Sequence, residues 1–158
     1  MGGKVIIIGA VNVDIVARAA RLPRAGETVA GGDLAVLLGG KGANQAVAAA
    51  QAGVSATMIG AVGDMSFGLS PIAMKEAYGV ETSAIARTAG PSGAALTTVD
   101  DAGENQITVS RGANARISTA DITEILFLPA LAQVEPPPAA PIRAFARAKS
   151  FGADTIRN

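Results

Sequence analysis

A continuous run of β-branched residues, from Val5 to Ile8, is the feature that most limits the folds open to this chain. A strand that is apolar at every position is typically buried on both faces, as in a parallel sheet covered by helices. A second such run extends from Ala56 to Val62, and a helical pattern lies between the two runs. The order strand, helix, strand predicts an α/β fold with a parallel sheet.

Further segments continue this order toward the C-terminus. We expect helices over Ala43–Ala52, from Pro71 (with Ser70 as N-cap) to Tyr78, from Ser118 and over Ile142–Ser150, and further strands over Pro129–Val134 and from Asp154. The Pro-rich segment Glu135–Pro141 is expected to form neither a helix nor a central strand, because proline lacks the N–H that both require.

Two stretches interrupt the alternation of strands and helices. Residues 28–38 are strand-like, and they follow the turn sequence LPRAGET. Residues 93–110 hold two short strand-like segments around the polar sequence DDAGEN, which is typical of a hairpin. These stretches therefore do not fit a simple repeat of strand and helix.

The residue types present exclude several classes of chemistry. The chain has 158 residues, enough for one domain, and a net charge of zero, which argues against nucleic acid and anionic membranes as partners. It has no cysteine and no histidine, so disulfides, thiolate metal sites and the commonest general base are excluded. Its N-terminal apolar run is too short for a signal peptide or a membrane span, so we expect a cytoplasmic protein.

The sequence GGKGANQ, from Gly39 to Gln45, joins a strand-like segment to a helix, where many proteins bind phosphate. A Walker-type loop ending in Gly40 and Lys41 requires glycine at residue 35 and serine or threonine at residue 42. The chain has Ala35 and Gly42 at these positions. The G-x-G-x-x-G pattern of dinucleotide-binding proteins is not met here either, so both phosphate-binding motifs are excluded.

The polar groups around this turn suit a ligand with several hydroxyl groups. Lys41, Asn44 and the backbone N–H groups of the first helical turn are donors, and Asn44 is also an acceptor. Asn12 and Asp14 follow the first buried strand, at the edge where α/β sheets bind ligands. A sugar hydroxyl both donates and accepts hydrogen bonds, whereas phosphate requires only donors. Taken singly, each residue also fits a structural role, since glycines cap helices and lysines are usually solvated.

These motifs together resemble the PfkB family of carbohydrate kinases. GGKGANQAVAAAQAG, followed by nine residues and then Gly63, has the spacing of the first signature of that family. The segments IGAVNVDIVARAARLPRAGETV and GAALTTVDDAGENQITVSRGANARIS resemble its ribokinase branch. The resemblance is strong over residues 4–125 and continues more loosely to Asn158.

The resemblance implies a ribokinase-like α/β fold in which a central sheet has helices on both faces and carries a small β lid. Residues 1–158 would form the N-terminal half of one such domain, with lid segments at about 14–37 and 93–110. In this family the lid closes over the sugar and pairs with the lid of a second subunit, which implies a homodimer.

The resemblance also implies a reaction, the ATP-dependent phosphorylation of D-ribose at its 5-hydroxyl. The positions that match sugar-binding residues of the family are Asn12, Asp14, Gly40, Lys41, Asn44, Ala95, Thr97, Val109 and Glu135. Glu135 equally fits an ordinary residue of a Pro-rich loop. ATP, Mg²⁺ and a monovalent cation are the implied cofactors, and we expect them to bind mainly to residues beyond Asn158.

The catalytic residues of the family have no counterpart in this sequence. The GAGD motif, which supplies the catalytic base and a phosphate-binding helix, is absent, as is the N-x-x-E stretch tied to Mg²⁺. We therefore expect the base to lie beyond Asn158 and the 158 residues alone to be inactive. The alternatives are a sugar-binding or dimerisation module without kinase activity, and a PfkB kinase for another sugar or a nucleoside.

Overall fold

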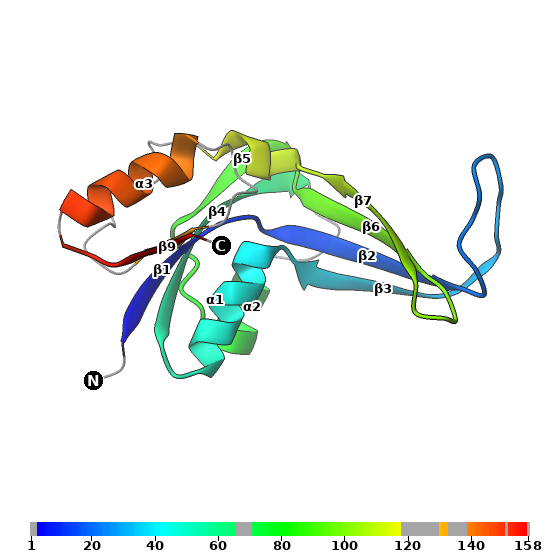
Figure 1. The fold of residues 1–158 in the computed structure, drawn as a ribbon, viewed down its shortest axis with the longest axis horizontal. Coiled ribbons are helices and arrows are strands. Elements are labelled where there is room, and N and C mark those ends of the chain that lie inside the picture. The colour runs from blue at the N-terminus through cyan, green and yellow to red at the C-terminus, as the bar shows by residue number, and fades with distance from the viewer. Residues whose placement is uncertain (1–2, 66–70, 118–129, 133–138, 151, 158) are drawn as a thin grey trace.

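The computed structural model describes residues 3–65, 71–117, 130–132, 139–150 and 152–157, which form two sheets (Figure 1). The larger sheet is parallel and has the strand order β5-β4-β1-β8-β9. Its strands are β1 (Lys4–Ile8), β4 (Ser55–Met65), β5 (Ile85–Pro91), β8 (Ala130–Ala132) and β9 (Thr155–Arg157). The two apolar runs become β1 and β4, as expected, and the structure shows that these two strands pair with each other.

Helices cover both faces of the larger sheet, with α1 and α2 on one face and α3 on the other (Figure 1). They are α1 (Lys41–Gln51), α2 (Pro71–Tyr78) and α3 (Ala139–Ser150). Because successive strand residues point to opposite faces, Ile7 of β1 packs with Ala43 and Ala46 of α1. Ile6 and Ile8 pack with Ala144 and Ala148 of α3. The expected three-layer arrangement is therefore confirmed.

The smaller sheet has four strands in the order β3-β2-β6-β7, and we call it the small sheet. Its strands are β2 (Asn12–Ala19), β3 (Gly31–Gly39), β6 (Gly93–Val99) and β7 (Asn105–Ser110). The pairs β2–β3 and β6–β7 are antiparallel, and β2 and β6 are parallel. The two stretches that interrupted the sequence pattern thus form one sheet together with β2, and this sheet extends away from the α/β layers (Figure 1).

Two expectations about the larger sheet are wrong. β5 was not expected, because its sequence IARTAGP contains Gly and Pro and carries no strand pattern. It forms because it pairs with β4 from Gly60 onward, so the neighbouring strand supplies the hydrogen-bond partners. The apolar run that predicted β4 ends at Val62, but the strand continues through Gly63 and Asp64 to Met65 for the same reason.

Three further helix and strand boundaries differ from the expected ones by two residues or more. α3 begins at Ala139, so the last three residues of the Pro-rich segment are helical, contrary to expectation. Pro141 is tolerated because N–H groups in the first helical turn have no partner within the helix. α1 begins two residues earlier than expected, at Lys41, and β3 begins at Gly31 rather than Thr28.

Several expected features lie outside the described residues. These are Ser70 as an N-cap, the helix from Ser118 and the ends of the strand expected over Pro129–Val134. The middle of that strand is confirmed as β8, which pairs with β1.

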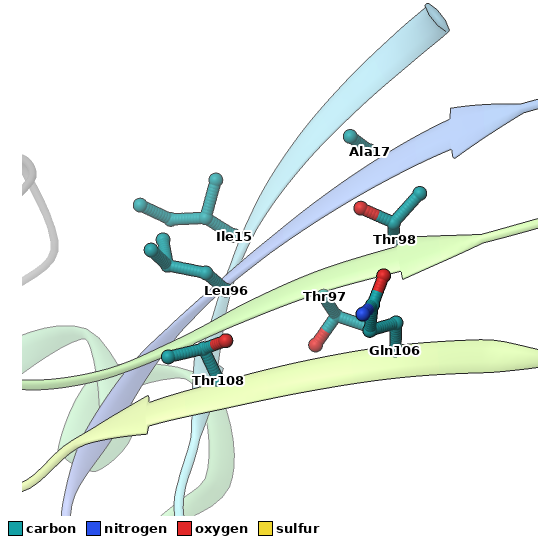
Figure 2. Close-up of a pocket in the computed structure, with 7 residues that line it drawn as sticks. All are labelled: Ile15, Ala17, Leu96, Thr97, Thr98, Gln106 and Thr108. Atoms are coloured by element: carbon teal, nitrogen blue, oxygen red, sulfur yellow. The ribbon is translucent and has the colours of Figure 1, made fainter. Parts of the chain in front are cut away.

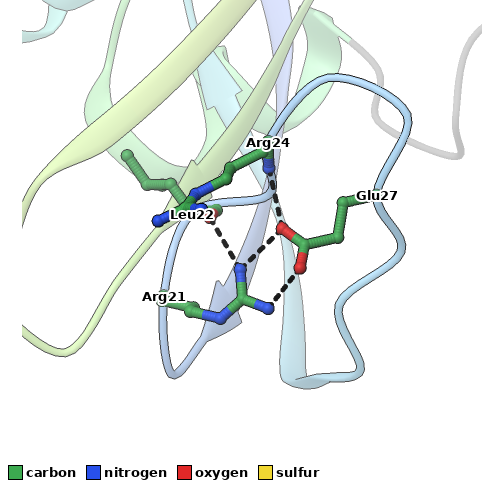
Figure 3. Close-up of polar contacts among 4 residues, drawn as sticks. All are labelled: Arg21, Leu22, Arg24 and Glu27. Atoms are coloured by element: carbon green, nitrogen blue, oxygen red, sulfur yellow. Dashed lines mark hydrogen bonds and ion pairs between the residues drawn. The ribbon is translucent and has the colours of Figure 1, made fainter.

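The loop between β2 and β3 is the turn expected from LPRAGET, and an ion pair closes it (Figure 3). The Arg21 guanidinium donates hydrogen bonds to both carboxylate oxygens of Glu27, and the backbone N–H of Arg24 donates to Oε2 at 3.0 Å. The Arg21 side chain, and next the Arg24 N–H, lower the pKa of Glu27 from 4.5 to about 2. The loop therefore holds a carboxylate that stays charged in acid.

We expect the carboxyl carbon of Glu27 to titrate with a midpoint near pH 2 in a ¹³C NMR experiment. Because the folded-state pKa is lowered, the ion pair contributes fully above about pH 4.5 and its contribution is lost as the pH falls toward 2. Arg21→Gln should raise the midpoint. Arg24→Gln is the control and should leave it low, since Arg24 acts through its backbone N–H. A wild-type midpoint near 4.5 would contradict the contact.

Candidate functional site

The small sheet brings five of the nine expected sugar-binding residues onto one face. Asn12 of β2 lies opposite Gly39 and Gly93, and Asp14 lies opposite Leu37 and Ala95. Residues directly opposite one another, and residues two apart on one strand, share a face of a sheet. The five residues on this face, which we call the Asp14 face, are Asn12, Asp14, Ala95, Thr97 and Val109.

The carboxylate of Asp14 lies directly over Gly39. A Cβ at Gly39 would overlap the carboxylate carbon and both oxygens of Asp14, so the side chain occupies the space that any other residue at position 39 would fill. Gly39 is itself opposite Asn12, so the carboxylate leans toward Asn12. Asp14 is half-buried and Asn12 is 8% exposed. The carboxylate of Asp14, which can only accept hydrogen bonds, thus lies beside the amide of Asn12 at the end of the small sheet where β2 begins.

The turn between β3 and α1 lies against the segment that joins β1 to β2. Gly40 has a φ of 93°, and a Cβ there would overlap the carbonyl oxygen of Ala10. That carbonyl accepts a hydrogen bond from the N–H of Ala43 at 3.2 Å. One of the helical N–H groups that we expected to be available to a ligand is therefore already engaged.

Lys41 and Asn44 follow this turn in the first residues of α1, and both are exposed. Gly39 and Gly40, immediately before them, are buried. Since Gly39 pairs with Asn12, the turn continues from the Asp14 face into the start of the helix. The structure therefore brings Gly40, Lys41 and Asn44 to the end of the small sheet that carries Asn12 and Asp14.

Asn114 is a polar residue of this region whose role the sequence did not reveal. It lies in a 3₁₀ helix, Gly112–Arg116. Its side chain is 4% exposed and bonds to the β1–β2 junction. Oδ1 accepts from the N–H of Val11 at 3.0 Å, and Nδ2 donates to Oδ1 of Asn12 at 2.8 Å.

The opposite face of the small sheet is hollowed (Figure 2). The hollow has a volume of about 270 Å³ and is lined by Ile15, Ala17, Leu96, Thr97, Thr98, Gln106 and Thr108. Strand alternation places Ile15, Leu96 and Thr98 on the face away from Asp14. The hollow therefore lies mainly on the face away from Asp14. Thr97, one of the predicted sugar-binding residues, is among the residues that line it.

Glu135, the ninth expected residue, lies outside the described residues. Among the residues that the structure describes, no group of three or more Asp or Glu side chains could hold a metal ion. The helices described there are all too short or too polar to cross a membrane.

Known proteins resemble this chain along most of its length. The family model described as "pfkB family carbohydrate kinase" matches residues 3–136. The ribokinase of Bacillus subtilis is 38% identical over 131 residues, which are 83% of this chain and 43% of that protein. The ribokinase of Mus musculus is 32% identical over 160 residues, 98% of this chain and 50% of that protein. The deoxyribokinase of Salmonella typhi is 34% identical over 119 residues, which are 75% of this chain and 39% of that protein.

Solved structures resemble this chain as well. The ribokinase of Arabidopsis thaliana, complexed with ribose and ATP, superimposes with a TM-score of 0.84 at 28% identity, covering 99% of this chain and 53% of that one. This confirms the ribokinase-like fold. The chain spans about half the length, or less, of the relatives named above. Because the family model matches most of its residues, the chain belongs to the PfkB family of carbohydrate kinases.

Proposed function

We propose that this chain supplies the sugar-binding surface and the lid of a ribokinase-type enzyme, which transfers phosphate from ATP to the 5-hydroxyl of D-ribose. The observation that carries the proposal is the placement of the Asp14 carboxylate over Gly39, beside the amide of Asn12. The similarity to ribokinases, one of them solved with ribose and ATP, supports the same reaction class.

The chemistry of the Asp14 face suits a sugar rather than a phosphate. The carboxylate of Asp14 accepts hydrogen bonds and repels anions, whereas Asn12, Lys41 and Asn44 supply donors. A vicinal diol can donate to the carboxylate while accepting from the amides. Ala95, Thr97 and Val109 on the same face present mostly apolar groups, which would cover the carbon side of a sugar. We therefore propose these seven residues, together with Gly40, as the described part of the site.

ATP, Mg²⁺ and a monovalent cation belong to the proposed reaction, but the residues described here do not fit them. The part of the chain that the structure describes contains no metal-binding group of carboxylates, and the sequence contains neither the GAGD nor the N-x-x-E motif. We propose that these cofactors bind mainly to residues that this sequence does not include. A cytoplasmic location, where ATP is available, stays a prediction.

A kinase for 2-deoxyribose is the second candidate function. The match to the Salmonella typhi deoxyribokinase has nearly the same identity as the matches to ribokinases. Ribose and 2-deoxyribose differ by one hydroxyl group, so the choice between the two candidates depends on whether the site binds that hydroxyl. Comparing the affinities of ribose and 2-deoxyribose for the chain discriminates between the two candidates.

We also propose that the small sheet is the lid and that it pairs with the small sheet of a second copy. Large apolar side chains are exposed on both faces of this sheet, among them Leu37, Ile107 and Val109 on the Asp14 face and Leu34 and Leu96 on the other. Apolar area of this extent on a projecting sheet is typical of an interaction surface.

The first prediction from these proposals concerns the affinity for ribose, measured by isothermal titration calorimetry. Asp14→Asn should weaken ribose binding at least about tenfold, because it removes a charged acceptor of hydroxyl protons. Asp33→Asn is the matched control, since it removes the same charge from an exposed position on β3, and its affinity should be unchanged. Equal affinities of the wild type and Asp14→Asn would contradict the site.

The second prediction concerns phosphate transfer by the 158-residue chain. Incubation with ATP, Mg²⁺ and ribose should yield no ribose 5-phosphate, because the base and the anion-binding helix of the family are missing from the sequence. Detection by mass spectrometry of ribose 5-phosphate above the level of a protein-free control would show this expectation to be wrong.

The third prediction concerns the oligomeric state, measured by sedimentation equilibrium. The chain should form dimers, and a charge on the small sheet should dissociate them, as in Ile107→Asp on the Asp14 face or Leu96→Asp on the other. Ile142→Asp on α3 is the control, since Ile142 is exposed but lies outside the small sheet. A monomeric wild type, or dimers that resist both substitutions, would contradict lid pairing.

A further inference from the structure

We infer that Asn114 is a positioning residue that determines which end of the Asn12 side-chain amide faces the sugar. This inference rests on the proposed function, because it concerns the ligand at the Asp14 face. Asn114 itself takes no part in the proposed contacts with the sugar. Its effect passes through Asn12, to which it is bonded although the two residues are 102 positions apart in the sequence.

The backbone of Val11 fixes the orientation of the Asn114 amide. The N–H of Val11 donates to Oδ1 of Asn114 at 3.0 Å, and Nδ2 of Asn114 donates to the carbonyl oxygen of Val11 at 3.3 Å. A backbone N–H can only donate and a carbonyl can only accept, so a flipped amide would place two donors together and two acceptors together. The side chain of Asn114 thus pairs with both backbone polar groups of Val11, its N–H and its carbonyl oxygen.

This orientation determines that of Asn12 in turn. The remaining proton on Nδ2 of Asn114 is donated to Oδ1 of Asn12 at 2.8 Å. Since both side chains are less than a tenth exposed, a reversed Asn12 would bury two amide donors against each other. The oxygen of Asn12 is therefore engaged with Asn114, so Nδ2 is the end of the Asn12 amide that is turned away from this bond. Asn12 consequently presents donors to a ligand.

The surroundings of the pair hold it in this geometry. A Cβ at Gly93, the residue opposite Asn12 on β6, would overlap Nδ2 of Asn114 and Oδ1 of Asn12, so their hydrogen bond crosses the space over this glycine. The 3₁₀ helix is fixed at its other end by Arg116, whose guanidinium donates to Oγ1 of Thr88 and to the carbonyl of Ala89. Asn114 therefore sits on a segment anchored to the larger sheet.

The chemical consequence is a directional requirement on the sugar. A hydroxyl placed between Asn12 and Asp14 accepts a hydrogen bond from Nδ2 of Asn12 and donates its proton to the carboxylate of Asp14. A hydrogen atom at this position would make neither bond, and a protonated amine could not accept from Asn12. Asn114 thus contributes to the selection of a hydroxyl group at one carbon of the ligand.

A double-mutant cycle between residue 114 and the sugar tests this inference. Ribose, 2-deoxyribose and 3-deoxyribose are titrated against the wild-type chain and Asn114→Ala. Ribose affinity should fall about tenfold or more, while the deoxy sugar that lacks the hydroxyl at Asn12 should bind both proteins about equally. Asn105→Ala, an exposed amide on β7, is the control and should change none of the affinities. Equal weakening of all three sugars, or no weakening, would overturn the inference.

A second measurement tests the orientation of the Asn114 side-chain amide. It needs no ligand, and it can be made even if Asn114→Ala does not fold. Hydrogen exchange of the Asn114 side-chain protons is followed by NMR in the wild type, Asn12→Asp and Asn12→Ala. Asn12→Asp keeps the acceptor and should keep exchange slow, whereas Asn12→Ala removes it and should speed exchange. Equally fast exchange in both variants would show that the orientation is wrong. Slow exchange in Asn12→Asp, with no ribose binding by the wild type, would support the orientation and contradict the proposed function.

Discussion

The close approach of the chain to itself between β1 and β2 is the constraint on which the candidate site depends. Here the chain leaves the larger sheet and enters the small sheet within three residues, packed against the start of α1. A Cβ at Gly42 would lie 2.7 Å from Cα of Gly9, and one at Gly40 would overlap the carbonyl of Ala10. Only glycine allows this contact, so the glycine turn fixes the position of α1 relative to β2.

The same junction links the fold to the proposed sugar site. β2 begins at Asn12, immediately after the junction, and its pairing with Gly39 brings the end of β3 and the start of α1 alongside. Asp14 then fits over Gly39 because no side chain stands there. The glycine turn, Gly39–Gly42, resembles a phosphate loop in sequence. We propose instead that it holds the Asp14 carboxylate and the Asn12 amide in place on the small sheet. The missing phosphate-binding motifs agree with this role.

The sequence predicted the features that depend on local pattern. The buried runs of β1 and β4, α1, α2 and the β6–β7 hairpin follow from hydrophobic periodicity and turn residues. The position of Asn12 and Asp14, directly after the first buried strand, follows from the order of residues in the sequence. β5 could not be predicted, because its strand character comes from pairing with β4 rather than from its own residues. The role of Asn114 was hidden for a similar reason, since its partners Val11 and Asn12 lie more than a hundred residues away. The helical start of α3 was obscured by prolines that a first turn accepts.

The most direct test of the central claim is where ribose binds on the chain, which chemical-shift mapping with ¹⁵N-labelled protein measures. We predict that ribose shifts the amide signals of Asn12, Asp14, the Gly39–Asn44 turn and Ala95. The signals of Ile15, Thr98 and Thr108, around the hollow on the opposite face, should stay in place. Shifts centred on the hollow, or no shifts at saturating ribose, would contradict the account.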